Sequence, residues 1–153
     1  AMGVRLAGVV PSNAAAIDRY AMHVGTGFQV LNDLKDWGGD LENDRRVAGD
    51  LLGGRPTLLW ALAMERLTPR DAARLREIAA VARRSDRPRD TASLVAEART
   101  LYERARVVPQ ARAVASSQRA AALKSLADCR LARLRDVLEF LLDLAVPEPA
   151  IES

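Results

Sequence analysis

The chain has little cysteine, histidine, lysine or aromatic side chain. It contains one cysteine and one histidine among 153 residues, and 4% of the residues are aromatic. A single cysteine excludes an internal disulfide, so nothing in the sequence requires an oxidising compartment. His23 has no acidic residue or cysteine at ligand spacing, which favours a packing or surface role. These shortages argue against a disulfide-rich domain and against a zinc site.

Long apolar runs are also absent. No run approaches the about 18 residues that a membrane-spanning helix needs, and the opening segment AMGVRLAGVVP is too short and too weakly patterned for a signal peptide. We therefore expect a cytoplasmic protein with no membrane span. Binding to nucleic acid is not supported, because the sequence has no basic stripe interleaved with aromatics and no recognisable binding motif.

Aliphatic residues and arginine make up much of what is present. Hydrophobic residues account for 49% of the chain, and its length is enough for one domain with a core. An abundance of Ala, Leu and Arg favours helices packed by aliphatic side chains, so the predicted fold class is all-α. The net charge is only +3, and Lys35 and Lys124 are the sole lysines among 23 basic residues. We interpret most arginines as solvated helical surface.

Proline, glycine and capping residues predict where the helices begin and end. We expect helices over 14–36, 56–66, 69–84 and 91–107, and a final helical pattern over 110–145 that is continuous or divides near Ser116-Ser117. Ser12 or Asn13 is a suitable N-cap for the first helix, and Thr68 for the third. The tail 148–153 is expected to fray.

Two further expectations concern how these helices pack. The inward face of the first helix should carry Ile17, Tyr20, Ala21, Val24, Phe28 and Leu31. Gly25 and Gly27 each cost a helix interior about 1 kcal/mol relative to alanine, which suggests that something packs closely there. The third helix should bury a stripe of Ala72, Leu75, Ile78, Ala79 and Ala82.

The most informative stretch runs from Gly25 to Thr57. Residues three and four apart on a helix share a face, so one set of side chains projects its oxygens to one side: Gln29, Asn32, Asp33, Asp36 and Asp40. Acidic groups at the mouth of an apolar core cost stability unless a cation or a donor compensates them. A long polar loop with three arginines follows, and such loops are uncommon in compact domains unless they are functional.

This stretch is similar to a known motif. The run is Phe28-Gln29-x-x-Asn32-Asp33-x-x-Asp36, then Gly39-Asp40, Arg46, Gly49-Asp50-Leu51, Gly54-Arg55 and Thr57-Leu58. It resembles the second aspartate-rich region of trans-polyprenyl diphosphate synthases, FQ-x-x-DD-x-x-D, then G-D, a lysine and D-L-x-x-G-K-x-T-L-P. One apparent deletion lies between Arg46 and Asp50. Asn32 replaces an aspartate, Arg46 and Arg55 replace lysines, and Leu59 replaces a proline.

The resemblance implies both a fold and a site. It implies that residues 1–147 form the C-terminal part of the isoprenoid synthase helical bundle. It also implies a Mg²⁺ site at Asn32, Asp33, Asp36 and Asp40, catalytic roles for Asp33, Asp36 and Gln29, and diphosphate binding by Arg46 and Arg55. The implied reaction transfers an allylic prenyl group to isopentenyl diphosphate. We expect Asp33 and Asp36 to be exposed to a cavity that Arg46 and Arg55 also face.

The first aspartate-rich helix of that family is not found in residues 1–24. We therefore expect the chain to act only when completed by an N-terminal half, by a separate subunit or through a homodimer, and to expose apolar surface by itself. Two alternatives stay open. One is a non-catalytic helical subunit, regulatory or structural, of prenyltransferase descent. The other is a terpene-cyclase-like enzyme that ionises a diphosphate, because an asparagine at this kind of position occurs in such cyclases. The sequence does not give the product chain length.

Overall fold

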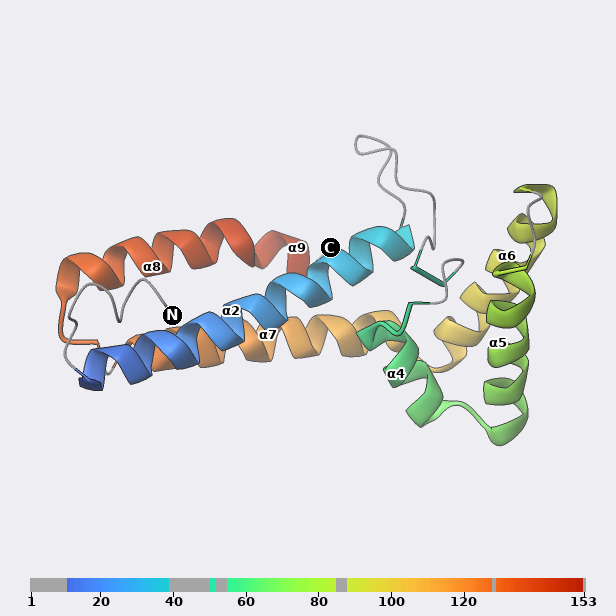
Figure 1. Ribbon diagram of the computed structural model, residues 1–153, viewed down its shortest axis with the longest axis horizontal. Coiled ribbons are helices and arrows are strands. Elements are labelled where there is room, and N and C mark those ends of the chain that lie inside the picture. The colour runs from blue at the N-terminus through green and yellow to red at the C-terminus, as the bar shows by residue number, and fades with distance from the viewer. Residues whose placement is uncertain (1–10, 39–49, 52–54, 85–87, 128, 153) are drawn as a thin grey trace. The chain divides into compact units, whose positions relative to one another are not determined.

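The computed structural model describes residues 11–38, 50–51, 55–84, 88–127 and 129–152 (Figure 1). These residues form helices and short connections and contain no strand, so the predicted all-α class is confirmed and agrees with the isoprenoid synthase helical fold. Among the helices described, none is both long and apolar enough to cross a membrane.

The helices divide between two compact units. In chain order they are α2 (Pro11–Gly38), α4 (Leu58–Arg66), α5 (Pro69–Ala82), α6 (Pro88–Arg104), α7 (Val107–Leu126), α8 (Ala132–Ala145) and α9 (Glu148–Glu152). One unit comprises Ala1–Leu31 with Arg112–Ser153, and the other comprises Asn32–Ala111. The last turns of α2 and the first turn of α7 therefore belong to the second unit.

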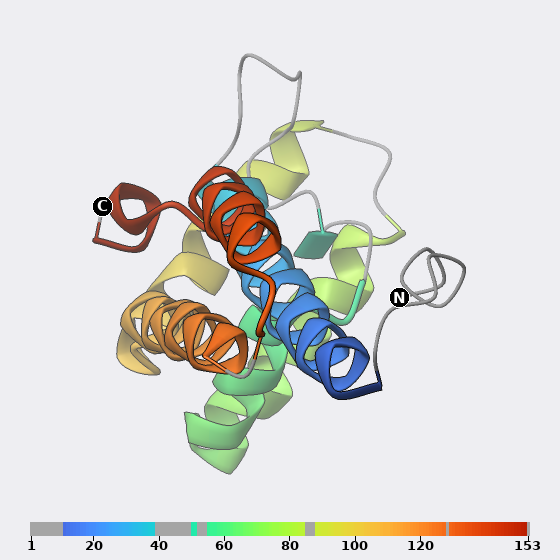
Figure 2. The same cartoon turned by 90° about the vertical axis from the view of Figure 1, so that its left-hand side faces the viewer.

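In the first unit α2, α7 and α8 run alongside one another (Figures 1 and 2). Close approach depends on small residues, because Ala16, Ala115 and Ala122 are completely buried. A Cβ added to Gly27 would lie 3.2 Å from Cγ2 of Val146, whereas one added to Gly25 would meet nothing within 4 Å. The predicted close packing is therefore confirmed at Gly27 but not at Gly25.

The inward face of α2 differs from the predicted one. Ile17, Tyr20 and Leu31 are buried as expected, but Phe28 is 49% exposed and Ala21 is also exposed. A Cβ at Gly27 would meet Val146, just after α8, and Gln118 of α7, so position 27, and not position 28, faces the neighbouring elements. The predicted cap is also wrong: α2 begins at Pro11, so Asn13 lies inside its first turn.

Caps and periodicity predicted the second unit more closely. The hydroxyl of Thr68 accepts from Asp71 N at 3.2 Å, as expected for the N-cap of α5, and the whole predicted α5 stripe is buried. Helix α4 begins two residues later than predicted, with Thr57 as its cap. Helix α6 ends at Arg104, and Arg106, with a φ of 52°, separates it from α7. Pro109 consequently lies in the first turn of α7, where a proline is tolerated.

The C-terminal segment is more ordered than the sequence suggested. The long pattern divides after Leu126 and not at Ser116-Ser117, and the tail that was expected to fray forms α9. Arg119 on α7 explains this order: its Nη1 donates to the Val146 carbonyl at 2.9 Å, and its guanidinium also pairs with Asp143 and Glu148. One largely buried arginine thus ties the ends of α8 and α9 to α7.

Candidate functional site

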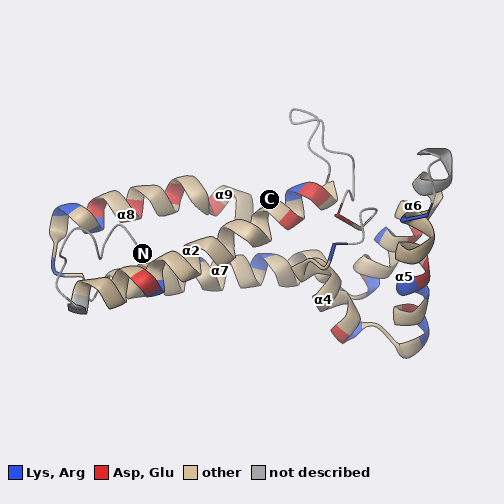
Figure 3. Cartoon of the chain, in the orientation of Figure 1, with Lys and Arg blue, Asp and Glu red and all other residues tan. Residues whose placement is uncertain are grey.

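Acidic residues lie in the last turns of α2 (Figure 3). Asp33 is only 3% exposed, and its Oδ2 accepts from the Leu58 amide at 2.9 Å. Leu58 is the first residue of α4, whose opening N–H groups have no partner within the helix. A carboxylate at this end also complements the positive end of the α4 dipole. The motif acid Asp33 therefore caps α4.

Asp36, one turn later, makes a second main-chain contact. It binds the described residues that precede α4, 50–51 and 55–57, which we call the returning segment. Its Oδ2 accepts from the Asp50 amide at 2.8 Å, and Asp50 Oδ1 pairs with Arg55 Nη1 at 3.0 Å. The Arg55 amide also donates to the Asp50 carbonyl at 2.9 Å. The Arg55 side chain is 78% exposed, although its Nη1 pairs with Asp50.

These residues meet at one small cavity. It is lined by Asp33, Asp36, Trp37, Asp50, Leu51, Arg55, Thr57, Leu59, Trp60 and Tyr102 and holds about 10 Å³ of open space. That volume suits roughly one water molecule. A diphosphate would therefore require these side chains to move apart.

An aromatic pair forms one wall of this cavity. Trp37 stacks on Tyr102 of α6 with ring centroids 4.3 Å apart, and Cζ of Arg99 lies 5.8 Å from the Trp37 ring. Burial, and after it the negative charge of Asp33, raises the pKa of the Tyr102 phenol. Sequence reasoning did not identify Tyr102, because it lies outside the motif and no local pattern links it to α2.

The structure places the predicted site residues in different surroundings. Asp33, Asp36 and Arg55 line one cavity, and Asn32 is half-buried beside Asp33. Gln29 is exposed on α2, whereas Asp40 and Arg46 lie outside the described residues. Asp33 lines this cavity as expected, but it is only 3% exposed, because its carboxylate also accepts from the amide at the start of α4.

The donor chemistry nevertheless suits Mg²⁺. In the part of the chain that the structure describes, no three His, Cys, Asp or Glu side chains are grouped to hold a metal ion. Mg²⁺ in phosphate-binding sites commonly takes only one or two protein carboxylates and fills its remaining positions with water and phosphate oxygens. The half-buried Asn32 and Asp36 offer oxygens of the hard type that this ion prefers. The metal assignment stays a prediction.

Fold and site together define an all-α protein in which Asp33 and Asp36, at the end of α2, line one cavity with Arg55. The sequence pattern of the polyprenyl synthetase family matches residues 1–98. The chain belongs to this family.

Curated relatives agree with this assignment. The octaprenyl diphosphate synthases of Escherichia coli (strain K12) and Shigella flexneri are each 38% identical over 72 residues, 46% of this chain and 22% of the relative. The short chain isoprenyl diphosphate synthase of Methanothermobacter thermautotrophicus is 32% identical over 114 residues, 74% of this chain and 33% of the relative. The chain thus matches between about a fifth and a third of these relatives' length. No solved structure gave a significant match.

Proposed function

We propose that the chain is the C-terminal half of a Mg²⁺-dependent polyprenyl diphosphate synthase. When completed by an N-terminal half, it would transfer an allylic prenyl group to isopentenyl diphosphate. The observation that carries this proposal is the meeting of Asp33, Asp36, Asp50 and Arg55 at one cavity, within the residues that match the family.

The proposed roles divide between metal and diphosphate. Asn32, Asp33, Asp36 and Asp40 would hold Mg²⁺, which neutralises the charge of a departing diphosphate. Arg55 is exposed beside this cluster and can donate two parallel N–H groups to phosphate oxygens. Arg46 is proposed as a second donor of this kind, and Gln29 as a further catalytic residue.

The family suggests the substrates, and the partial match to the relatives suggests that a further part completes the chain. We propose an allylic prenyl diphosphate and isopentenyl diphosphate as substrates. We propose an N-terminal half, a separate subunit or a second copy as the completing part. Matches that cover 22% and 33% of the relatives support the need for such a part.

The test is to change Asp36 in the completed protein. Asp36→Asn removes the charge but keeps an oxygen that can accept from the Asp50 amide, so the returning segment should stay in place. We expect turnover to fall by about 10²-fold or more, as is typical when a charge that stabilises the transition state is lost. The far-UV circular dichroism should be unchanged.

Asp136→Asn on the exposed surface of α8 is the matched control and should leave turnover unaltered. Equal turnover of wild type and Asp36→Asn would contradict the catalytic assignment.

A second candidate is a non-catalytic helical subunit of the same descent. It is favoured by the two motif carboxylates that accept from main-chain amides around about 10 Å³ of space. If this candidate is correct, the completed protein folds but binds no Mg²⁺–pyrophosphate, and Asp36→Asn changes only its stability.

A further inference from the structure

Tyr102 joins α6 to the acidic end of α2. Tyr102 is 4% exposed, and its ring stacks on Trp37 with an interplanar angle of 26°; Trp37 directly follows Asp36. Tyr102 also lines the cavity that Asp33 and Asp36 line. Aromatic stacking of this kind adds to the stabilisation that comes from the buried area. The stack therefore fixes the last turn of α2 against α6.

A second contact from α6 reinforces this stack. Arg99 lies three residues before Tyr102, so both side chains project from one face of α6. The Arg99 guanidinium carbon is 5.8 Å from the Trp37 ring centroid, within the range of a cation–π contact. Trp37 thus has two contacts from α6, and Asp36 is its neighbour in the chain.

The position of this turn decides whether the acids reach their partners. Asp33 accepts from Leu58 at 2.9 Å and Asp36 from Asp50 at 2.8 Å. Both bonds weaken steeply when the turn shifts by about 1 Å, because heavy-atom distances beyond about 3.2 Å fall outside the usual range. The stack and the two bonds form a chain of contacts from α6 through α2 to the returning segment.

We propose that Tyr102 is a positioning residue of this site. Its ring holds the last turn of α2 so that Asp33 and Asp36 keep the start of α4 and Asp50 in register. The acids and Arg55 are thereby presented to the ligand in one geometry. The ligand itself, Mg²⁺ with a diphosphate, rests on the proposed function, whereas the positioning is a property of the 153-residue chain.

The direct test follows the Leu58 and Asp50 amides by NMR in the 153-residue chain. Tyr102→Leu removes the ring, and we expect it to shift both amide resonances and to speed hydrogen exchange at Leu58 by about tenfold, the effect of losing about 1.4 kcal/mol of local protection. Tyr102→Phe keeps the ring and should stay close to wild type. The Leu75 amide on the buried face of α5 reports any loss of overall stability.

Two other variants make this test specific. Tyr20→Leu removes the other buried tyrosine, which belongs to the first unit, and should leave the Leu58 and Asp50 resonances in place. Trp37→Leu removes the stack from the α2 side and should reproduce the effect of Tyr102→Leu, which keeps the test available if that variant does not fold. Unchanged Leu58 and Asp50 amides in a folded Tyr102→Leu or Trp37→Leu variant would overturn the proposal.

Binding separates this inference from the proposed function. Wild type, Tyr102→Leu and Tyr102→Phe in the completed protein are titrated with Mg²⁺ and pyrophosphate by calorimetry. We expect Tyr102→Leu to weaken binding about tenfold, because misplaced groups bind less well, and Tyr102→Phe to restore it. No binding by wild type contradicts the proposed function and leaves the amide result to decide the role of Tyr102. Equal binding by wild type and Tyr102→Leu contradicts the positioning role alone.

Discussion

Asp33 serves the fold of this site as well as its proposed chemistry. As one of the motif acids, it was predicted from the resemblance to hold a metal, yet it is buried and bonded to the Leu58 amide. The sequence could assign Asp33, Asp36 and Arg55 to one motif, because the spacing of the motif is local, and these residues line one cavity. It could not reveal that Asp33 caps α4 or that Tyr102 stacks on Trp37, since both contacts join distant residues.

Asp33→Ala should therefore destabilise the chain in the absence of Mg²⁺. The change leaves the partly buried Leu58 N–H without its partner, which costs about 1–3 kcal/mol. Asp33→Asn should cost less, because its amide oxygen still accepts that bond. Urea unfolding at neutral pH measures both values. An Asp33→Ala variant as stable as wild type would mean that the contact with Leu58 contributes nothing.

Gly25 and Gly27 offer a matched pair on one helix. An added methyl group at Gly25 meets nothing within 4 Å, so Gly25→Ala should stabilise α2 by about 1 kcal/mol through helix propensity. The same change at Gly27 forces a Cβ to 3.2 Å from Val146 and should lose most or all of that gain. Thermal unfolding of the two variants gives the comparison. Equal gains at both positions would show that α2 and Val146 are not in close contact.

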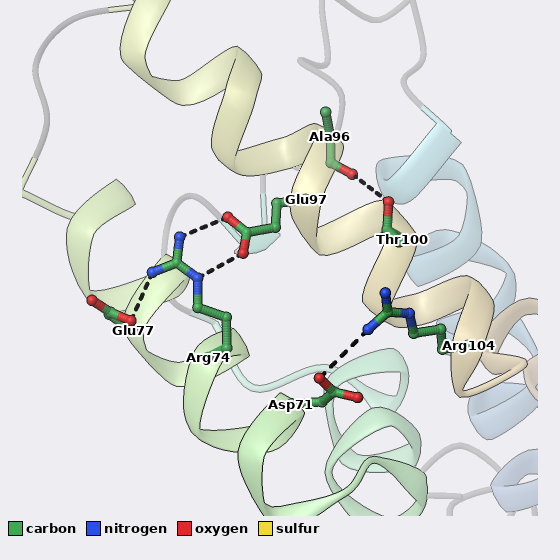
Figure 4. Close-up of polar contacts among 7 residues, drawn as sticks. All are labelled: Asp71, Arg74, Glu77, Ala96, Glu97, Thr100 and Arg104. Atoms are coloured by element: carbon green, nitrogen blue, oxygen red, sulfur yellow. Dashed lines mark hydrogen bonds and ion pairs between the residues drawn. The ribbon is translucent and has the colours of Figure 1, made fainter.

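Helices α5 and α6 are joined by a cluster of charged side chains (Figure 4). Arg74 of α5 donates through Nε and Nη2 to the two carboxylate oxygens of Glu97 on α6, and through Nη1 to Glu77. Arg104 pairs with Asp71 at 3.6 Å. The hydrogen bond from Arg74 holds the pKa of the Glu97 carboxyl below its ordinary value of 4.5. This ion pair should therefore depend on pH.

The direction of that dependence follows from the lowered pKa. A carboxyl with a lowered pKa in the folded chain contributes stability above its unfolded pKa and loses it as the pH falls through the folded value. A double-mutant cycle of Arg74→Ala and Glu97→Ala should show favourable coupling at neutral pH and little coupling in acid below the pKa of Glu97. Chemical unfolding of the four chains measures it. Equal coupling at both pH values would contradict the ion-pair account.

Elements were predictable where local chemistry decides their structure. Helix α5 followed from the Thr68 cap and its apolar period, and both are confirmed. The prediction that Phe28 lies on the inward face of α2 was wrong, because the close approach of Gly27 to Val146 decides which face points inward. Helix α9 was missed for a similar reason: the Arg119 contacts with Val146 and Glu148 come from a distant part of the sequence.

The chain as a whole exposes a group of apolar side chains along α8. Val137, Phe140, Leu141 and Leu144 of α8 are 53%, 61%, 46% and 65% exposed, and their spacing places them on one face of the helix. Exposed apolar surface was expected of a bundle that is incomplete by itself, and this part of the expectation is confirmed. It supports the proposal that the chain is completed by a further part.

The proposed prenyl transfer can be tested by completing the chain with an N-terminal half. Radiolabelled isopentenyl diphosphate and an allylic primer are supplied with Mg²⁺ to the chain alone and to the chain joined with an N-terminal half that carries a D-D-x-x-D helix. The proposed reaction needs metal and diphosphate positioned between two aspartate-rich helices, and this positioning is lost when one of them is absent. We therefore predict no prenyl product from the chain alone and product from the completed protein. Product from the chain alone, or a folded completed protein that makes none, would contradict the account.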